Sequence, residues 1–241
     1  MFNRVWNLAP LTALRGPRRL VAADRDQQPP LPDRKPESIQ KVGSLRELGT
    51  SLDNPDTDAA YFEVPEVPNQ ELFIKHIGAL LSSVFEDVKL KLTNVSASKT
   101  SRIRSIIKGA KNGLNLPKDS PTRTELETLI DQIADDISIT LSHFKGQRIS
   151  LFTAKGSAGD GQAAGYFHVD SYESGTSKVI RTYVGRSTEF ALNLNGNGAV
   201  SPKNGAITVH RLNTIHRAAI LKRGEIRFAI AVSLYKPKKY A

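Results

Sequence analysis

The chain contains no cysteine, one methionine and one tryptophan among its 241 residues. The absence of cysteine excludes disulfides, thiolate nucleophiles, zinc fingers and iron–sulfur clusters. Any bound metal must therefore be held by histidine and carboxylate side chains. No apolar run approaches the roughly 18 residues needed to span a bilayer, so no transmembrane segment is expected. Hydrophobic residues make up 39% of the chain and charged residues 24%, which is typical of a protein with an ordered core.

Positive charge exceeds negative charge, with 34 Lys and Arg against 24 Asp and Glu, but it is unevenly distributed. Residues 1–23 contain four arginines and no acidic residue, which suits a disordered basic tail or, alternatively, an organelle-targeting segment. Residues 24–70 hold ten acidic and five basic residues and are rich in proline. We therefore interpret 1–70 as a disordered tail and linker. We expect a cytoplasmic protein, with organelle targeting through the basic N-terminus as the alternative.

Residues 71–241 are expected to form a single domain, helical in 71–145 and β-rich in 146–241. Apolar residues recur at helical spacing from Glu71 to Val88 and from Pro121 to Phe144. Short β runs separated by Gly-, Ser- and Asn-rich turns follow. This order predicts an α+β fold with N-terminal helices packed on a C-terminal antiparallel barrel or double-sheet jelly roll. The expected strands are Arg148–Ala154, Tyr166–Asp170, Val179–Val184, Thr188–Leu192, Gly205–Arg211 and Arg227–Tyr235.

A basic stretch, residues 89–123, lies between the two expected helices and holds nine Lys and Arg but only one acidic residue. Such a stretch suits a nucleic acid or another acidic partner. It contains no aromatic residue that could stack on a base, and no nucleic-acid-binding motif. We therefore favour the simpler interpretation, a solvated helix surface, over nucleic-acid binding.

The residues typical of metal chemistry occur in the β-rich part. His168 and Asp170 form an H-x-D pair, and residues i and i+2 of a strand point to the same face. Two histidine nitrogens and one carboxylate oxygen form the facial triad that binds non-haem Fe(II). The third ligand must then be a later histidine. His216 is the better candidate and His210 the alternative, although His210 alternates with apolar residues and suits a surface position or a place beside the site.

The last expected strand begins with an arginine and has two contrasting faces. Alternation places a cation and three small residues on one face: Arg227, Ala229, Ala231 and Ser233. The other face carries Phe228, Ile230, Val232 and Leu234. A lone cation followed by small side chains suits the floor of a cavity, whereas the bulky face suits packing outside it. A guanidinium there can bind a carboxylate through two parallel hydrogen bonds.

The order H-x-D, then His, then Arg, in a β-rich C-terminal half, resembles the Fe(II)- and 2-oxoglutarate-dependent dioxygenase superfamily, whose core is a double-stranded β-helix. Residues 120–235, with FHVD, RTYVGRSTEF and IHR, also resemble an uncharacterised bacterial family with the pattern FH-x-D…TY-x-GPGTE…HR. The chain departs from that pattern at Arg186 and Ser187, where the family has a Pro-Gly pair. The resemblance does not extend to the tail, the acidic segment or the basic stretch.

The resemblance implies a role for each matching residue. Fe(II) would be bound by His168, Asp170 and His216. The distal carboxylate of 2-oxoglutarate would be bound by Arg227. Tyr183 lies where the superfamily often supplies a hydroxyl to that carboxylate, and Arg181, two residues earlier, would share its face.

The implied activity is oxidation of a substrate, by hydroxylation or demethylation, coupled to decarboxylation of the co-substrate 2-oxoglutarate. Neither the residues nor the resemblance identifies the substrate, whether a small molecule or a macromolecule. Two alternatives remain open. A cupin-like metal-dependent enzyme would keep the triad but need no carboxylate-binding arginine. A non-catalytic protein would bind an acidic partner through its basic surface, and that binding would weaken steeply with salt.

Overall fold

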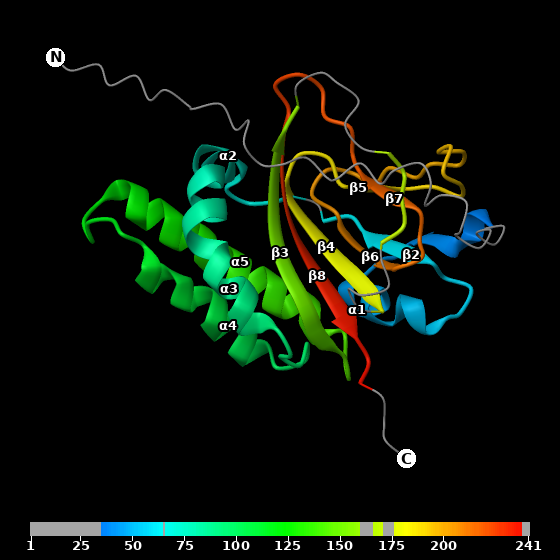
Figure 1. Ribbon diagram of the computed structural model, residues 1–241, viewed down its shortest axis with the longest axis horizontal. Coiled ribbons are helices and arrows are strands. Elements are labelled where there is room, and N and C mark those ends of the chain that lie inside the picture. Colours follow the sequence, from blue (N-terminus) through cyan, green and yellow to red (C-terminus); the bar gives the residue numbers. More distant parts are fainter. Residues whose placement is uncertain (1–34, 65, 160–165, 171–175, 238–241) are drawn as a thin grey trace, which may run out of the picture. The chain divides into compact units, whose positions relative to one another are not determined.

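A six-stranded sheet forms the centre of the fold in the computed structural model, which describes residues 35–64, 66–159, 166–170 and 176–237. Its strands are β1 (Ile39–Lys41), β2 (Ala59–Phe62), β3 (Arg148–Ala158), β4 (Ser177–Val184), β6 (Ile207–Arg211) and β8 (Ile226–Tyr235), in the order β1-β2-β6-β4-β8-β3. A second, two-stranded sheet consists of β5 (Thr188–Phe190) and β7 (His216–Ala218). Every pairing is antiparallel except that of β1 with β2. The small sheet and the main helices lie on opposite sides of the large sheet (Figure 1).

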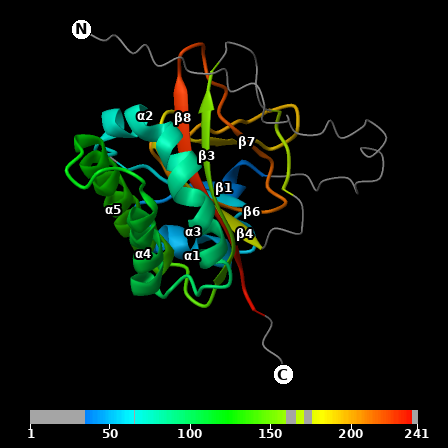
Figure 2. The ribbon, with the colours of Figure 1, turned by 60° about the vertical axis from the view of Figure 1, so that its left-hand side comes forward.

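The helices come mostly from the first half of the described chain and cover one face of the large sheet (Figure 2). They are α1 (Leu45–Thr50), α2 (Gln70–Ala79), α3 (Phe85–Leu92), α4 (Thr100–Gly109) and α5 (Pro121–Ser142), with a π-helical segment η4 (Leu80–Val84) joining α2 to α3. Short 3₁₀ segments are η2 (Pro36–Ser38), η3 (Ser51–Asp53) and η5 (Ala110–Gly113). None of the helices in the described residues is both long enough and apolar enough to cross a membrane. The coarse prediction of a mixed fold with a large, mostly antiparallel sheet is confirmed, although β1 and β2 precede the main helices.

Aromatic side chains fill the space between the helices and the large sheet. Phe73 of α2 contacts Tyr183 of β4 and Phe228 of β8, and Phe85 of α3 contacts Phe152 of β3, with ring centroids 4.9 to 6.0 Å apart. All five side chains are at most 4% exposed. Full burial of one such ring contributes roughly 1.5–3 kcal/mol, so this cluster is a main source of the adhesion between helices and sheet.

The predicted division of β8 into two faces is confirmed. Its bulky residues, Phe228, Ile230, Val232 and Leu234, all belong to the core on the helical side. Alternation therefore directs Arg227 and the small residues after it toward the opposite face, the one nearer the small sheet. This inner face of the large sheet positions the candidate site.

Residues 35–64 belong to the folded domain, which corrects the prediction of a linker through residue 70. β2 pairs with β6, and β1 extends the sheet by one further strand. Arg211 of β6 fixes the loop that precedes β2, because it donates to the carbonyl oxygens of Thr57 and Leu52 at 2.9 and 2.8 Å. These short strands are stabilised by neighbours that are distant in sequence, so their own composition gives little indication of them.

The compact unit spans Arg34–Ala241, so the domain boundary lies well before the predicted residue 71. The predicted strand Tyr166–Asp170 is also shorter than expected, since only His168 forms a bridge there. The basic segment 1–23, with its two interpretations as a tail or a targeting segment, lies outside the described residues.

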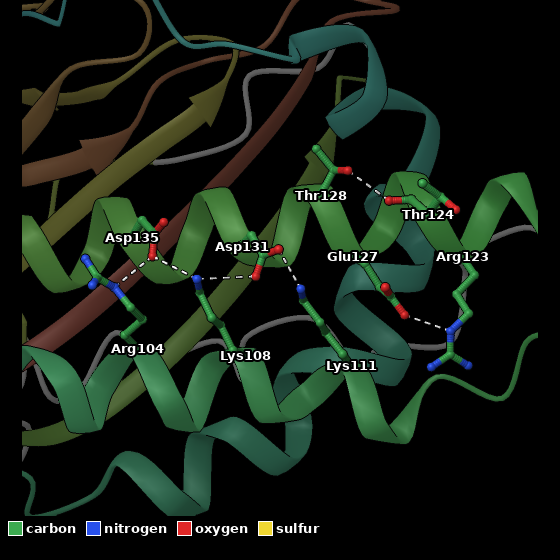
Figure 3. Close-up of polar contacts among 9 residues, drawn as sticks. All are labelled: Arg104, Lys108, Lys111, Arg123, Thr124, Glu127, Thr128, Asp131 and Asp135. Atoms are coloured by element: carbon green, nitrogen blue, oxygen red, sulfur yellow. Dashed lines mark hydrogen bonds and ion pairs between the residues drawn. The ribbon is translucent and has the colours of Figure 1, made fainter. Parts of the chain in front are cut away.

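Part of the basic stretch is neutralised by acidic residues of α5 (Figure 3). Arg104 of α4 lies 2.8 Å from a carboxylate oxygen of Asp135, and Lys111 lies 2.5 Å from one of Asp131. Lys108 lies between the two acids, 3.6 Å from Asp131 and 3.3 Å from Asp135. These partly exposed basic side chains therefore pair with a neighbouring helix, which favours the interpretation as a helix surface over nucleic-acid binding.

Replacing Asp131 with alanine is expected to lower the free energy of unfolding by about 1 kcal/mol, because exposed ion pairs each contribute only about 0.2–1 kcal/mol. The loss should shrink in high salt, since these partly exposed charges are screened. Urea denaturation measures it. Asp119→Ala is the matched control, because exposed Asp119 forms no ion pair within the described part of the chain. Equal stability of the two variants at low salt would contradict this role for Asp131.

Candidate metal centre

Backbone pairing brings two of the predicted metal ligands together. The amide of His168 donates to the carbonyl of His216 at 2.9 Å, and the amide of His216 donates back at the same distance. This antiparallel bridge places the two imidazoles side by side, with ring centroids 4.6 Å apart. Two histidines that are distant in sequence thus extend from one bridge toward the same space.

Each of these histidines is oriented by a backbone carbonyl two residues earlier. Nδ1 of His168 lies 3.0 Å from the carbonyl oxygen of Tyr166, and Nδ1 of His216 lies 2.9 Å from that of Thr214. A carbonyl only accepts, so each Nδ1 must carry the proton and donate. The tautomer is then fixed, and Nε2 presents its lone pair, which is the arrangement that a metal ligand requires.

Asp170 completes the set predicted from the H-x-D pair. One ligand atom from each of His168, Asp170 and His216 can be chosen so that all three lie within 4.8 Å of one another. The amide of Asp170 donates to the carbonyl of Leu212 at 3.0 Å, which fixes the segment against the turn that leads to His216. These two imidazole nitrogens and one carboxylate oxygen are positioned to bind a divalent metal together.

The electrostatics favour the protonation states that metal binding needs. Burial, assisted by the neighbouring His210, lowers the pKa of His216 to about 2, so its imidazole is neutral at pH 7. Burial alone would raise the pKa of Asp170, but His210 and Lys178 outweigh it and hold that pKa well below its ordinary value. Asp170 is consequently ionised at pH 7, with Nζ of Lys178 only 2.5 Å from its Oδ2.

His210, the alternative ligand, is completely buried beside this cluster, so its interpretation as a surface residue is wrong. Its ring centroid lies 4.2 Å from that of His216 and 5.6 Å from that of Phe190. Nε2 of His210 is 3.6 Å from Oδ2 of Asp170, which is longer than a hydrogen bond. The cluster able to hold a metal contains His216 and not His210.

Arg227 lies on the inner face of β8, as predicted, and is 6% exposed. Its Nε donates to the carbonyl of Arg186 at 2.9 Å, and one terminal nitrogen donates to the hydroxyl of Thr188 at 3.3 Å. Burial lowers the pKa of Arg227 to about 10, so the guanidinium stays charged at pH 7. Among the described residues no carboxylate forms an ion pair with it, which leaves a buried cation able to bind an anion.

The segment where the chain departs from the Pro-Gly pattern supports this arginine. The carbonyl of Arg186 accepts from Arg227, and the buried hydroxyl of Ser187 donates to the carbonyl of Lys203 at 2.7 Å. Gly185, just before them, has φ +75°, and a Cβ there would lie 2.2 Å from the carbonyl oxygen of Ile226. Only glycine allows β4 and β8 to approach so closely at this point.

The assignment of Tyr183 and Arg181 to the co-substrate is corrected by the structure. The two residues do share a face of β4, but that face packs against the helices. Tyr183 lies in the aromatic core beside Phe73, and burial raises its pKa well above the ordinary value. Nε of Arg181 lies 2.6 Å from a carboxylate oxygen of Asp136 in α5, and its terminal nitrogen donates to the carbonyl of Gly205. Neither side chain can reach a ligand on the inner face.

Two lysines on the inner face were not among the site residues predicted from the sequence. Lys178 pairs with Asp170, as described above. Lys155 of β3 is exposed in part, but the burial of its remainder lowers its pKa. The positive charges of Lys178 and Arg227 lower that pKa further, whereas Asp170 raises it. Lys155 pairs with Ala229 in the register of β3 and β8, so it shares the inner face with Arg227. Strand alternation relative to Phe152 would have indicated the inward face of Lys155, but nothing in the sequence distinguished it from a surface lysine.

A cavity of about 310 Å³ adjoins the segments that carry His168 and His216. Its walls include Phe167 and Arg217, whose guanidinium lies 4.1 Å from the centre of the Phe167 ring. Each of these residues is adjacent in sequence to a candidate histidine ligand, so alternation directs it away from the candidate cluster. Tyr166 and Leu194 line the same cavity and are 85% and 52% exposed.

Comparison with known proteins gave structural neighbours only. No family model matches the chain, and no curated protein does. A 2OG-Fe(II) oxygenase family oxidoreductase from Burkholderia pseudomallei aligns with a TM-score of 0.42 at 13% identity, covering 83% of this chain and 95% of that one. AviO1 from Streptomyces viridochromogenes gives 0.41 at 12%, covering 83% and 99%. A Pseudomonas putida prolyl-4-hydroxylase gives 0.36 at 13%, covering 81% and 96%. None of these three reaches a TM-score of 0.5, so the functional argument rests on the site itself.

Proposed function

We propose that the protein is a non-haem Fe(II)- and 2-oxoglutarate-dependent oxygenase that oxidises a substrate yet to be identified. The observation that carries the proposal is the cluster of His168, Asp170 and His216, in which both imidazoles are oriented to leave Nε2 free. A buried arginine, Arg227, on the inner face of the large sheet accompanies it. We further propose that the two sheets are the halves of a double-stranded β-helix.

The donor set fits Fe(II). Without cysteine, the available ligands are imidazole nitrogens and carboxylate oxygens, and two imidazoles with one carboxylate leave coordination positions open for small molecules. Closed structural sites instead use four protein ligands. The cluster offers three, and His210 has no nitrogen positioned to complete a fourth. An open three-ligand site supports catalysis rather than a purely structural metal.

Arg227 fits the distal carboxylate of 2-oxoglutarate. A guanidinium binds a carboxylate through two parallel hydrogen bonds, and the hydroxyl of Thr188 accepts a hydrogen bond from this guanidinium at 3.3 Å. The hydroxyl of Thr182 on the inner side of β4 is buried and has no hydrogen-bond partner among the described residues, so it can donate to the same carboxylate. Thr182 and Thr188 thus replace Tyr183 as candidate hydroxyl partners.

The residues of the chain would bind, orient and neutralise, while the iron, when bound, supplies the oxidising chemistry that converts 2-oxoglutarate and O₂ to succinate and CO₂ and places one oxygen atom in the substrate. His168 and His216 would present neutral nitrogens, and Asp170 would neutralise one positive charge of the metal. Arg227 would fix one end of the co-substrate. Ala229 and Ala231, the next residues on the inner face, leave room for its carbon chain.

Arg227→Gln is expected to weaken 2-oxoglutarate binding about 100-fold, since hydrogen bonds to a charged group contribute about 1.5–3 kcal/mol each. Calorimetric titration of 2-oxoglutarate into Mn(II)-loaded protein measures the affinity. Arg223→Gln, at an exposed arginine in the turn before β8, is the matched control. Metal binding without any binding of 2-oxoglutarate by the wild type would overturn the proposal in favour of a cupin-like enzyme.

A further inference from the structure

His210 is a buried histidine beside the candidate metal cluster whose ring nitrogens lack hydrogen-bond partners in the described part of the chain. Its side chain is 0% exposed. A buried polar atom without a partner destabilises the folded state. Such a group in a native structure indicates a functional requirement or a missing partner.

The environment of His210 differs from that of the two histidine ligands. His168 and His216 each donate Nδ1–H to a backbone carbonyl, which fixes their tautomers. His210 has no such contact, so either nitrogen can carry its proton. It lies on the inner face of β6, opposite Lys178 in the register of β4 and β6. The rings of Phe190 and His216 both pack against the His210 ring, at interplanar angles of 63° and 41°.

One acceptor is almost within reach. Oδ2 of Asp170 lies 3.6 Å from Nε2 of His210, about 0.6 Å beyond a normal N–H···O distance. Lys178 holds the same oxygen at 2.5 Å. A carboxylate that gives one oxygen to a metal has a second oxygen to be satisfied, and groups beside metal ligands commonly satisfy it.

We propose that His210 is a positioning residue that donates its Nε2–H to Asp170 and so holds the carboxylate with a single oxygen directed at the metal. The proposal rests on the proposed function, because it requires a metal at the cluster. Lys178, whose Nζ lies 2.5 Å from the same oxygen, is the second group on this side of the carboxylate.

Two substitutions separate this role from simple packing. His210→Phe keeps a buried planar ring but removes both nitrogens, whereas His210→Gln keeps a donor close to the position of Nε2. Co(II) affinity is measured by competition with a chromophoric chelator, and the d–d absorption bands of Co(II) report its coordination. His210→Phe is expected to bind Co(II) about 10- to 100-fold more weakly with altered d–d bands, and His210→Gln to stay within a few-fold of the wild type.

In His210→Phe the thermal stability of the metal-free protein should rise while its affinity for Co(II) falls. His210→Phe removes two buried atoms without partners, so the melting temperature of the metal-free variant should rise. Wild-type Co(II) affinity and d–d bands in His210→Phe would overturn the positioning role while leaving the proposed function intact. Equal losses of affinity in both variants, with lowered melting temperatures, would also overturn it in favour of packing. Failure of the wild type to bind Co(II) would overturn the proposed function and this inference together.

Discussion

Replacing His168 with alanine is expected to abolish stoichiometric metal binding. His168 supplies one of three ligand atoms in the cluster, and its loss should exceed the roughly 10- to 100-fold effect typical of residues that only position a ligand. Its side chain is also exposed, so the substitution should leave the fold almost unchanged. Equilibrium dialysis against Co(II), with the bound metal quantified per folded chain, measures the result.

The matched control for this loss is His143→Ala. His143 follows the end of α5, on the helical side of the large sheet, and belongs to no metal-binding cluster in the described residues. This variant should bind Co(II) with wild-type affinity and one-to-one stoichiometry. Retention of tight, stoichiometric Co(II) binding by His168→Ala would remove His168 from the ligand set.

Asp136→Ala is expected to be the most destabilising of the substitutions considered on the helical side of the sheet. It leaves the guanidinium of Arg181, 3% exposed, without its carboxylate partner. Removing one member of a buried ion pair costs about 3–5 kcal/mol. For a domain of this size that corresponds to a fall in melting temperature of about 6–20 °C. Thermal unfolding monitored by circular dichroism measures the fall.

A second substitution tests whether the loss of stability comes from the unpaired charge of Arg181. Arg181→Met removes that charge, so Asp136→Ala combined with Arg181→Met should be more stable than Asp136→Ala alone. Arg181→Met should also bind 2-oxoglutarate as the wild type does, because Arg181 faces the helices. A selective loss of 2-oxoglutarate affinity in folded Arg181→Met would restore the assignment of Arg181 to the co-substrate.

The contrast between β8 and β4 explains which faces can be predicted from sequence. In β8 the bulky residues alternate strictly with small ones, so burial of one face fixes the direction of Arg227. In β4 each face carries both apolar and polar side chains. Val179, Arg181 and Tyr183 lie on one face, and Lys178, Ile180 and Thr182 lie on the other. A shift of one residue exchanges the faces of a strand, and no local pattern prevents that error here. Residue spacing correctly placed Arg181 and Tyr183 together, but the resemblance placed them on the wrong side.

The ligand set was more predictable than the surrounding fold. His168 and Asp170 are two residues apart, so strand geometry alone brings them to one face. The choice between His210 and His216 depends on the turn between β6 and β7, which brings His216 into a bridge with His168. Residues 35–64 could not be placed in the sheet from sequence, because their short strands are stabilised by β6 and by Arg211.

The central claim is that one site holds Fe(II) and 2-oxoglutarate together, and anaerobic titration of the protein with both tests it most directly. Chelation of Fe(II) by 2-oxoglutarate produces a weak charge-transfer band in the visible spectrum. The wild type should develop this band with one-to-one stoichiometry, His168→Ala should not, and Arg227→Gln should require far more 2-oxoglutarate. Absence of the band in the wild type, or an unchanged band in both variants, would contradict the claim.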